Sequence, residues 1–151
     1  MVLIQSAQRF SLLKDFLKPG QYLTLSYLQI DRKRGRATLL NAAHPPLIHL
    51  SDTCRIVERP GDPIGCFDSF SPGEVSFTVQ PGDRIYLYSD GLIEEWRGAT
   101  VSRSEGLEKL TSCLRQHRSL EMGKSIEHCI KELHPDPTAA LDDLLLVGIE
   151  I

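Results

Sequence analysis

The sequence predicts an α+β fold, in which antiparallel strands are followed by a pair of helices and a closing strand. Short strand-like runs separated by proline and glycine turns fill residues 20–100. Apolar residues at helical spacing then occupy 104–133, and an apolar run closes the chain at 144–150. A chain of 151 residues has room for one domain with a single core, so we expect residues 1–151 to form one domain.

The first part of the chain is expected to contain a helix and then a series of strands. Residues 1–18 favour a helix, because Phe10, Leu13 and Leu17 lie at helical spacing before a proline-glycine pair. Strands are expected at 21–30, 36–42, 47–50, 54–58, 75–79 and 84–88. The first two predict an antiparallel hairpin. The last, Arg84–Tyr88, is apolar nearly throughout, which is typical of a central strand.

The second part of the chain is expected to hold the two helices and the closing strand. One helix should begin at about Ser104 and the other at about Ser119, and both serines are plausible N-caps. Leu144 to Ile149 is expected as a buried strand, which must return to the sheet formed by the earlier strands.

Composition excludes several classes of function. The net charge of -3 and the pI near 5.9 argue against nucleic acid or anionic lipid as a partner. No run approaches the roughly 20 apolar residues that span a bilayer, and the N-terminus lacks the basic region of a signal peptide. The four cysteines are scattered, which suggests free thiols in a reducing compartment. We therefore expect a cytoplasmic protein with no membrane contact.

Cys113 and His117 are four residues apart on an expected helix. This spacing could hold half of a zinc site. The sequence offers no matching second pair, so an ordinary helix face is the favoured interpretation.

Two acidic segments lie at the ends of apolar strands. Asp90-Gly91 follows Arg84–Tyr88, and Asp142-Asp143 precedes the closing strand. If these strands are antiparallel neighbours, the carboxylates converge at one rim of the sheet. Converging carboxylates repel one another unless a cation such as Mg²⁺ or Mn²⁺ neutralises them, and Gly91 would let the backbone approach the ion. The alternative interpretation is an ordinary turn and a solvated loop end.

Five segments, taken in order, carry a family pattern over roughly residues 20–151. Gln21–Tyr27 looks like an opening strand, Asn41–Leu47 resembles an "N-A-G-H-P-P" turn, and Gly61–Gly65 is similar to a "G-x-P-L-G" loop. Pro81–Glu94 matches "P-G-D-x-L-x-L-Y-T-D-G-L-x-E" nearly throughout, and Asp142-Asp143 stands in the place of "D-D-x-T-L-L". Together they resemble the SpoIIE/RsbU branch of the PPM (protein phosphatase 2C-like) metal-dependent serine/threonine phosphatases.

The resemblance implies an antiparallel β-sandwich flanked by helices and a two-metal hydrolase. In the family, two Mn²⁺ or Mg²⁺ ions acidify a water that attacks phosphoserine or phosphothreonine. The metal residues implied for this chain are Asp90, Gly91, Asp142 and Asp143. The implied partner is a phosphorylated regulatory protein, such as an anti-sigma-factor antagonist.

Three further residues are expected near the rim of this site. His44 matches the turn histidine of the family, for which we expect a structural or rim role. Ser89 and Glu94 flank the aspartate-glycine pair, and Glu94 is expected to face solvent or a partner of the ligands rather than a metal ion.

The sequence departs from the family in several places. Family members begin with an N-terminal block whose "D-x-x-G-H-G" motif supplies a metal-bridging aspartate. This motif is absent from the sequence, and we expect the strands of that block to be missing as well. Ala43 replaces a glycine, and Leu145 replaces a threonine. We therefore expect weak or absent metal binding and little activity in this chain alone, with homodimerisation through unpaired sheet edges. The alternative function is a non-catalytic phosphatase-like module that binds a regulatory partner.

Overall fold

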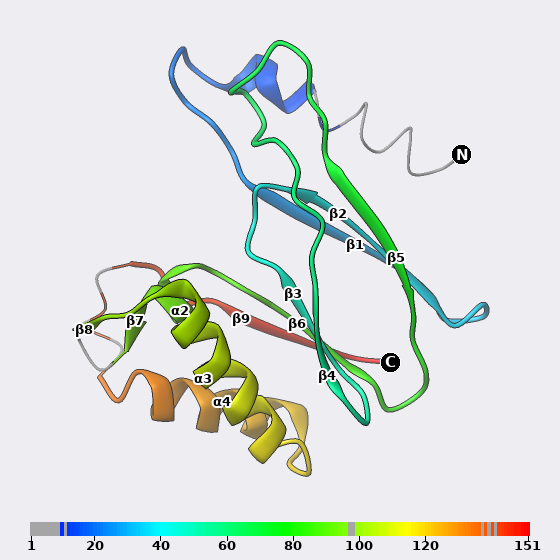
Figure 1. Cartoon of the computed structure of the whole chain (residues 1–151), viewed down its shortest axis with the longest axis vertical. Coiled ribbons are helices and arrows are strands. Elements are labelled where there is room, and N and C mark those ends of the chain that lie inside the picture. Colours follow the sequence, from blue (N-terminus) through cyan, green and yellow to red (C-terminus); the bar gives the residue numbers. More distant parts are fainter. Residues whose placement is uncertain (1–9, 11, 97–98, 137, 139, 141) are drawn as a thin grey trace. The chain divides into compact units, whose positions relative to one another are not determined.

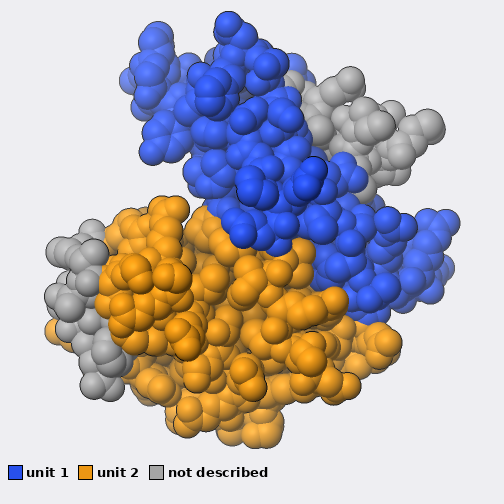
Figure 2. All heavy atoms as spheres, viewed as in Figure 1, with its two compact units in different colours: residues 1–44, 58–79 blue, residues 45–57, 80–151 orange. Residues whose placement is uncertain are grey.

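The computed structural model describes residues 10, 12–96, 99–136, 138, 140 and 142–151. The fold is α+β, as predicted, with antiparallel sheets and helices (Figure 1). The chain divides into two compact units, which are coloured separately in Figure 2. Unit 1 comprises Met1–His44 and Glu58–Val79, and unit 2 comprises Pro45–Val57 and Gln80–Ile151.

Unit 1 contains a three-stranded antiparallel sheet in the order β1-β2-β5. Its strands are β1 (Leu25–Asp31), β2 (Arg36–Ala42) and β5 (Gly73–Thr78). The predicted hairpin is present, since β1 and β2 pair along their whole length. The sequence prediction began β1 too early. Leu23 instead exchanges backbone hydrogen bonds of 2.9 Å with Ile64, and this isolated bridge draws the segment away from β2.

The expected N-terminal helix is only partly within the described residues, which exclude 1–9 and 11. At Leu12–Phe16 the structure has a short 3₁₀-helix, η1, rather than a continuous α-helix. None of its side chains is buried, and Phe16 is 84% exposed. Without a buried apolar face, little favours a longer α-helix over a single tighter turn.

Unit 2 is built on a four-stranded antiparallel sheet in the order β4-β3-β6-β9. The strands are β3 (Leu47–Leu50), β4 (Cys54–Val57), β6 (Arg84–Tyr88) and β9 (Leu146–Glu150). As the apolar run predicted, β6 is central, between β3 and β9. Helices α3 (Arg103–Gln116) and α4 (Met122–Leu133) pack on one face of this sheet (Figure 1). Their core partners on the strands are Ile48, Leu50, Tyr86, Tyr88 and Leu146.

The two main helices occupy the expected regions but begin at other residues. Ser102 is the N-cap of α3, where its side chain accepts a hydrogen bond from the Glu105 backbone N–H. Ser102 and Glu105 have the spacing of a capping box, a signal that was present in the sequence. The N-cap of α4 is Glu121, whose carboxylate accepts from the Gly123 N–H. The N-cap assignments to Ser104 and Ser119 were therefore wrong.

The closing strand is less buried than its sequence suggested. It begins at Leu146 rather than Leu144, and it stands at the end of the strand order with β6 as its neighbour. Leu146 faces the helices and is 9% exposed, whereas Val147 faces the other way and is 40% exposed. The expectation of a buried strand was wrong, because Leu146 is the only residue of β9 that is buried.

A buried polar pair fixes the turn before β6. Asp83 Oδ2 lies 2.8 Å from His49 Nε2 of β3 and accepts a 2.9 Å hydrogen bond from the Gln80 backbone N–H. Gly82 occupies the left-handed region with φ +86°. These contacts give a structural role to the Pro81-Gly82-Asp83 turn, which the sequence showed only as part of a motif.

Short elements connect the sheet of unit 2 to its helices. Helix α2 (Gly91–Glu94) follows β6, and β7 (Glu95–Trp96) pairs with β8 (Ala99–Thr100) ahead of α3. None of the helices in the described part of the chain has the length and apolarity that crossing a bilayer requires.

Candidate metal centre

The two acidic segments meet at one edge of the sheet in unit 2. Tyr88, the last residue of β6, pairs with Leu146, the first residue of β9. Asp90-Gly91 therefore leaves the sheet where Asp142-Asp143 approaches it. A Cβ atom added to Gly91 would lie 2.7 Å from the Asp143 carbonyl oxygen and 3.0 Å from Asp142 Cβ. Only glycine allows so close an approach between the two segments.

Ser89 ties these segments together. Its hydroxyl donates a 2.6 Å hydrogen bond to the Asp143 carbonyl oxygen and accepts a 2.9 Å bond from the Leu145 N–H. Its own backbone N–H donates to the Leu145 carbonyl at 3.1 Å. We call these three bonds the Ser89 clamp. The clamp extends the pairing of β6 with β9 up to the acidic residues and so fixes their backbone positions.

The Asp90 backbone starts the short helix α2. Its carbonyl oxygen accepts hydrogen bonds of 2.9 Å from the N–H groups of Ile93 and Glu94. The Asp90 side chain is half-buried, whereas Asp142 and Asp143 are exposed. The acidic rim, formed by Asp90, Asp142 and Asp143, thus has one half-buried carboxylate and two that face solvent, which leaves the site open to ions.

Glu94 forms an ion pair with Arg103. The Arg103 guanidinium donates to the Glu94 carboxylate. This hydrogen bond, the charge of Glu94 and, more weakly, the charge of Asp90 raise the pKa of Arg103 above its usual range. Arg103 therefore brings a permanent positive charge close to the acidic rim, a contribution that no motif in the sequence indicated.

The carboxylates do not form a tight trio. Of the described residues, only Cys113, His117 and Glu132 make a group of three metal-ligand side chains with all ligand atoms within 4.8 Å of one another. The segments Asp90-Gly91 and Asp142-Asp143 lie side by side, but the carboxylate oxygens of the three aspartates do not converge to that degree. Their arrangement fits part of a metal cage rather than a complete one.

His44 lies in unit 1, in a turn that its neighbours hold by hydrogen bonds. The His44 N–H donates to Asn41 Oδ1 at 2.8 Å, and Asn41 Nδ2 donates to the His44 carbonyl at 3.0 Å. His44 Nδ1 also lies 3.5 Å from the Thr24 hydroxyl. The two shorter contacts hold the turn through the His44 backbone, and a structural or rim role for the His44 side chain stays a prediction.

Ala43, in the turn between Asn41 and His44, adopts φ 54°, in the left-handed region that favours glycine. We expect Ala43→Gly to stabilise the protein by about 1 kcal/mol, because relief of about 1–2 kcal/mol of strain exceeds the entropic cost of a glycine. Urea denaturation measures the difference. The matched control is Ala42→Gly, at a buried strand position, which should destabilise the protein. A loss of stability in Ala43→Gly would contradict the strain argument.

Comparison with solved structures shows where this fold recurs. The RsbU and RsbW domains of a Mycobacterium tuberculosis protein match with a TM-score of 0.79 and 22% identity, over 95% of this chain and 41% of that one. The manganese-presoaked phosphatase domain of SpoIIE from Bacillus subtilis matches with a TM-score of 0.64 and 20% identity, over 99% of this chain and 64% of that one. The catalytic domain of the phosphatase PstP, solved with two manganese ions, matches with a TM-score of 0.64 and 15% identity, over 93% of this chain and 64% of that one.

These likenesses establish the fold, and the chain spans 41 to 64% of the length of those chains. No curated protein sequence matches the chain significantly. The family model described as Stage II sporulation protein E (SpoIIE) matches residues 5–151, nearly the whole chain. The chain therefore belongs to the SpoIIE family.

Proposed function

We propose that this chain forms part of a metal-dependent protein serine/threonine phosphatase of bacterial signalling. The observation that carries the proposal is the meeting of Asp90-Gly91 with Asp142-Asp143 at the paired ends of β6 and β9. Membership of the SpoIIE family and the fold shared with phosphatase domains support the reaction class.

The residues at this rim fit a hard divalent cation in donor type. Carboxylate oxygens are the ligands that Mg²⁺ and Mn²⁺ prefer, and the space that a Cβ of Gly91 would fill is taken by the opposing acidic segment. Asp90 and Asp142 would hold the metal, with Asp143 and the Gly91 backbone beside them. Bound Mn²⁺ or Mg²⁺ would supply Lewis acidity and a water of lowered pKa for attack on a phosphate ester.

The chain's own residues prepare this rim. The Ser89 clamp holds the backbone of the acidic pair, so only the side chains, and not the backbone, would need to be ordered when an ion binds. Arg103 offsets part of the negative charge that would otherwise build up around Asp90 and Glu94. The open, exposed position of Asp142 and Asp143 admits a bulky phosphoprotein substrate.

The complete catalytic domain needs more than these residues. The chain covers only part of the related structures, and its described residues bring together fewer ligands than a two-metal site requires. We propose that a further segment supplies the bridging aspartate. The substrate proposed is a phosphorylated regulatory protein, in line with the pairing of RsbU and RsbW domains in one matched structure.

A metal-exchange assay on the full gene product tests this function. Phosphoserine peptide hydrolysis should disappear after chelation and return when Mn²⁺ is added, because the nucleophilic water depends on the metal. The apo-protein should remain folded by circular dichroism. Activity that survives complete chelation would contradict a metal-dependent mechanism.

Ala43 and Leu145 motivate the alternative of a non-catalytic module that binds a regulatory partner. Calorimetry with Mn²⁺ on the full gene product separates the two functions. Tight binding of two ions favours the enzyme. Absence of binding, together with a stable complex with a phosphorylated partner, favours the module.

A further inference from the structure

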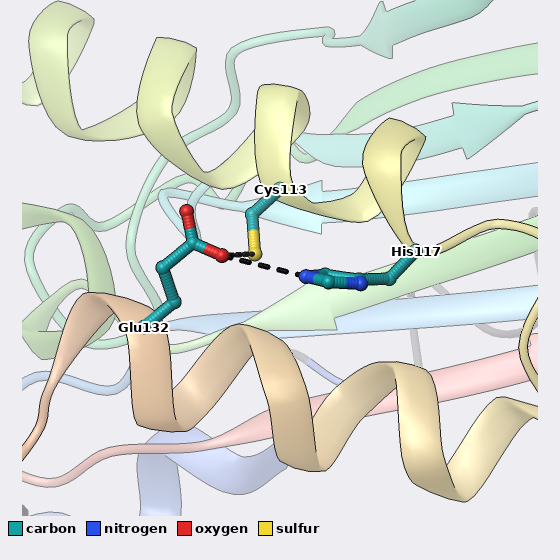
Figure 3. Close-up of side chains that lie close together, drawn as sticks. All are labelled: Cys113, His117 and Glu132. Atoms are coloured by element: carbon teal, nitrogen blue, oxygen red, sulfur yellow. Dashed lines mark hydrogen bonds and ion pairs between the residues drawn. The ribbon is translucent and has the colours of Figure 1, made fainter.

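A second cluster of ligand-type side chains lies between the two main helices, away from the acidic rim. Cys113 lies in α3, His117 is the C-cap residue of that helix, and Glu132 comes from the facing helix α4 (Figure 3). Cys113 Sγ lies 3.5 Å from Glu132 Oε2, and His117 Nε2 lies 3.4 Å from the same oxygen. All three ligand atoms lie within 4.8 Å of one another. One carboxylate oxygen is thus the common neighbour of a thiol and an imidazole.

These separations match the edges of a tetrahedral zinc site. Zinc bonds of about 2.0–2.3 Å to oxygen, nitrogen and sulfur place neighbouring ligand atoms about 3.3–3.8 Å apart in a tetrahedron. The two distances from Glu132 Oε2 fall within that range. The cysteine sulfur and the histidine nitrogen lie within 4.8 Å of each other, and the two residues are one helical turn apart in the sequence.

The donor set selects the kind of metal. A thiolate, an imidazole and one carboxylate favour a borderline-soft ion such as Zn²⁺ over the hard ions Mg²⁺ and Mn²⁺. We propose that Cys113, His117 and Glu132 bind one Zn²⁺, which joins α3 to α4, with water as the fourth ligand. Water can reach this position because the Glu132 side chain is 48% exposed.

The cluster borders the core of unit 2, where a bound ion would link the two packed helices α3 and α4. Cys113 is 2% exposed and belongs to the core of unit 2, next to the buried Cys129. The hydrogen bond with Cys129 and burial raise the pKa of the Cys113 thiol, so the ion must displace its proton. The His128 ring stacks on His117, with centroids 5.1 Å apart, and this contact orients the imidazole. Without an ion, the same groups form an ordinary hydrogen-bonded contact between helices.

Cobalt substitution tests the proposal on the full-length chain. Co²⁺ bound through a cysteine thiolate gives an intense sulfur-to-cobalt charge-transfer band, which carboxylate-bound Co²⁺ at the acidic rim does not give. We expect stoichiometric Co²⁺ to produce this band and Zn²⁺ to abolish it by displacement, because Zn²⁺ suits tetrahedral sulfur and nitrogen ligands better. A folded protein that shows no such band with Co²⁺ would overturn the proposal.

Variants assign the band to these residues. Cys113→Ser should remove it, whereas Cys66→Ser, at an exposed thiol outside the cluster, should leave it intact. Because Cys113 is buried and its replacement risks unfolding, Glu132→Gln serves as a second variant at a half-exposed position. It should weaken Co²⁺ binding at least about tenfold, as expected for loss of a direct ligand.

Glu127→Gln is the matched control on α4, since Glu127 is also exposed but pairs with Lys131 outside the cluster. It should bind Co²⁺ as the wild type does. Equal weakening by Glu132→Gln and Glu127→Gln, or a band that survives Cys113→Ser, would overturn the assignment. Asp90→Asn should leave the band unchanged, so the result does not depend on the phosphatase proposal.

Discussion

Asp90→Asn should lower the Mn²⁺-dependent phosphatase activity of the full gene product by a factor of roughly 10² or more. Loss of a residue that only supports a metal ligand costs about 10–100-fold, and the loss of a ligand itself should cost at least as much. Asparagine keeps the size of the side chain but removes the negative charge that holds the cation. The Asp90 backbone, which starts α2, stays in place. The measurement is the initial rate with a phosphoserine peptide at saturating Mn²⁺.

The control for this substitution is Asp52→Asn, also in unit 2. Asp52 is fully exposed. Among the described residues its one ion pair is with Arg118, whose guanidinium nitrogen lies 3.8 Å from Asp52 Oδ1. This variant should retain full activity, because an exposed pair of this kind contributes little. If Asp90→Asn were as active as Asp52→Asn and bound Mn²⁺ equally well, Asp90 would not be a metal ligand.

Gly106→Ala should destabilise the protein by about 2 kcal/mol. Gly106 lies in the first turn of α3, and a Cβ atom there would overlap the carbonyl oxygen of Ile93 in α2. Overpacking of this kind costs about 3 kcal/mol, against which alanine gains about 1 kcal/mol in helix propensity. Since the obstructing atom belongs to the backbone, no side-chain rotation relieves the overlap. The midpoint of urea denaturation should fall accordingly.

Gly123→Ala is the matched control, because Gly123 lies in the first turn of α4. A Cβ atom there meets only the Glu121 carboxylate, at an ordinary 3.4 Å. This variant should be neutral or stabilise the protein by up to about 1 kcal/mol. If Gly106→Ala were equally neutral, the packing of α2 against α3 would be looser than the structure shows.

The sheet and the acidic rim could be predicted from local patterns along the chain. The apolar run Arg84–Tyr88 has the pattern of a strand covered on both sides, and β6 is central. The placement of Asp90-Gly91 and Asp142-Asp143 directly beside two apolar strands predicted their meeting on the condition that the strands are antiparallel neighbours, and β6 and β9 are. These signals are local, so a single sequence contains them.

Features that depend on tertiary packing could not be predicted from the sequence. Glu132 approaches Cys113 and His117 only because α3 and α4 face each other, and no spacing in the sequence indicates this. The exposure of Val147 follows from the place of β9 at the end of the strand order, which an apolar sequence does not specify. The role of Asp83 likewise depends on His49, 34 residues earlier in the chain.

The Ser89 clamp has a consequence for biosynthesis. Its hydroxyl bonds to Asp143, 54 residues further along the chain, so the clamp can close only after that later segment has left the ribosome. Closing so long a loop is entropically costly, and contacts of this range form slowly. Assembly of the rim is thus a late event in folding. A nascent chain stalled before residue 142 would expose the edge of β6 without its partner, which favours aggregation or capture by chaperones.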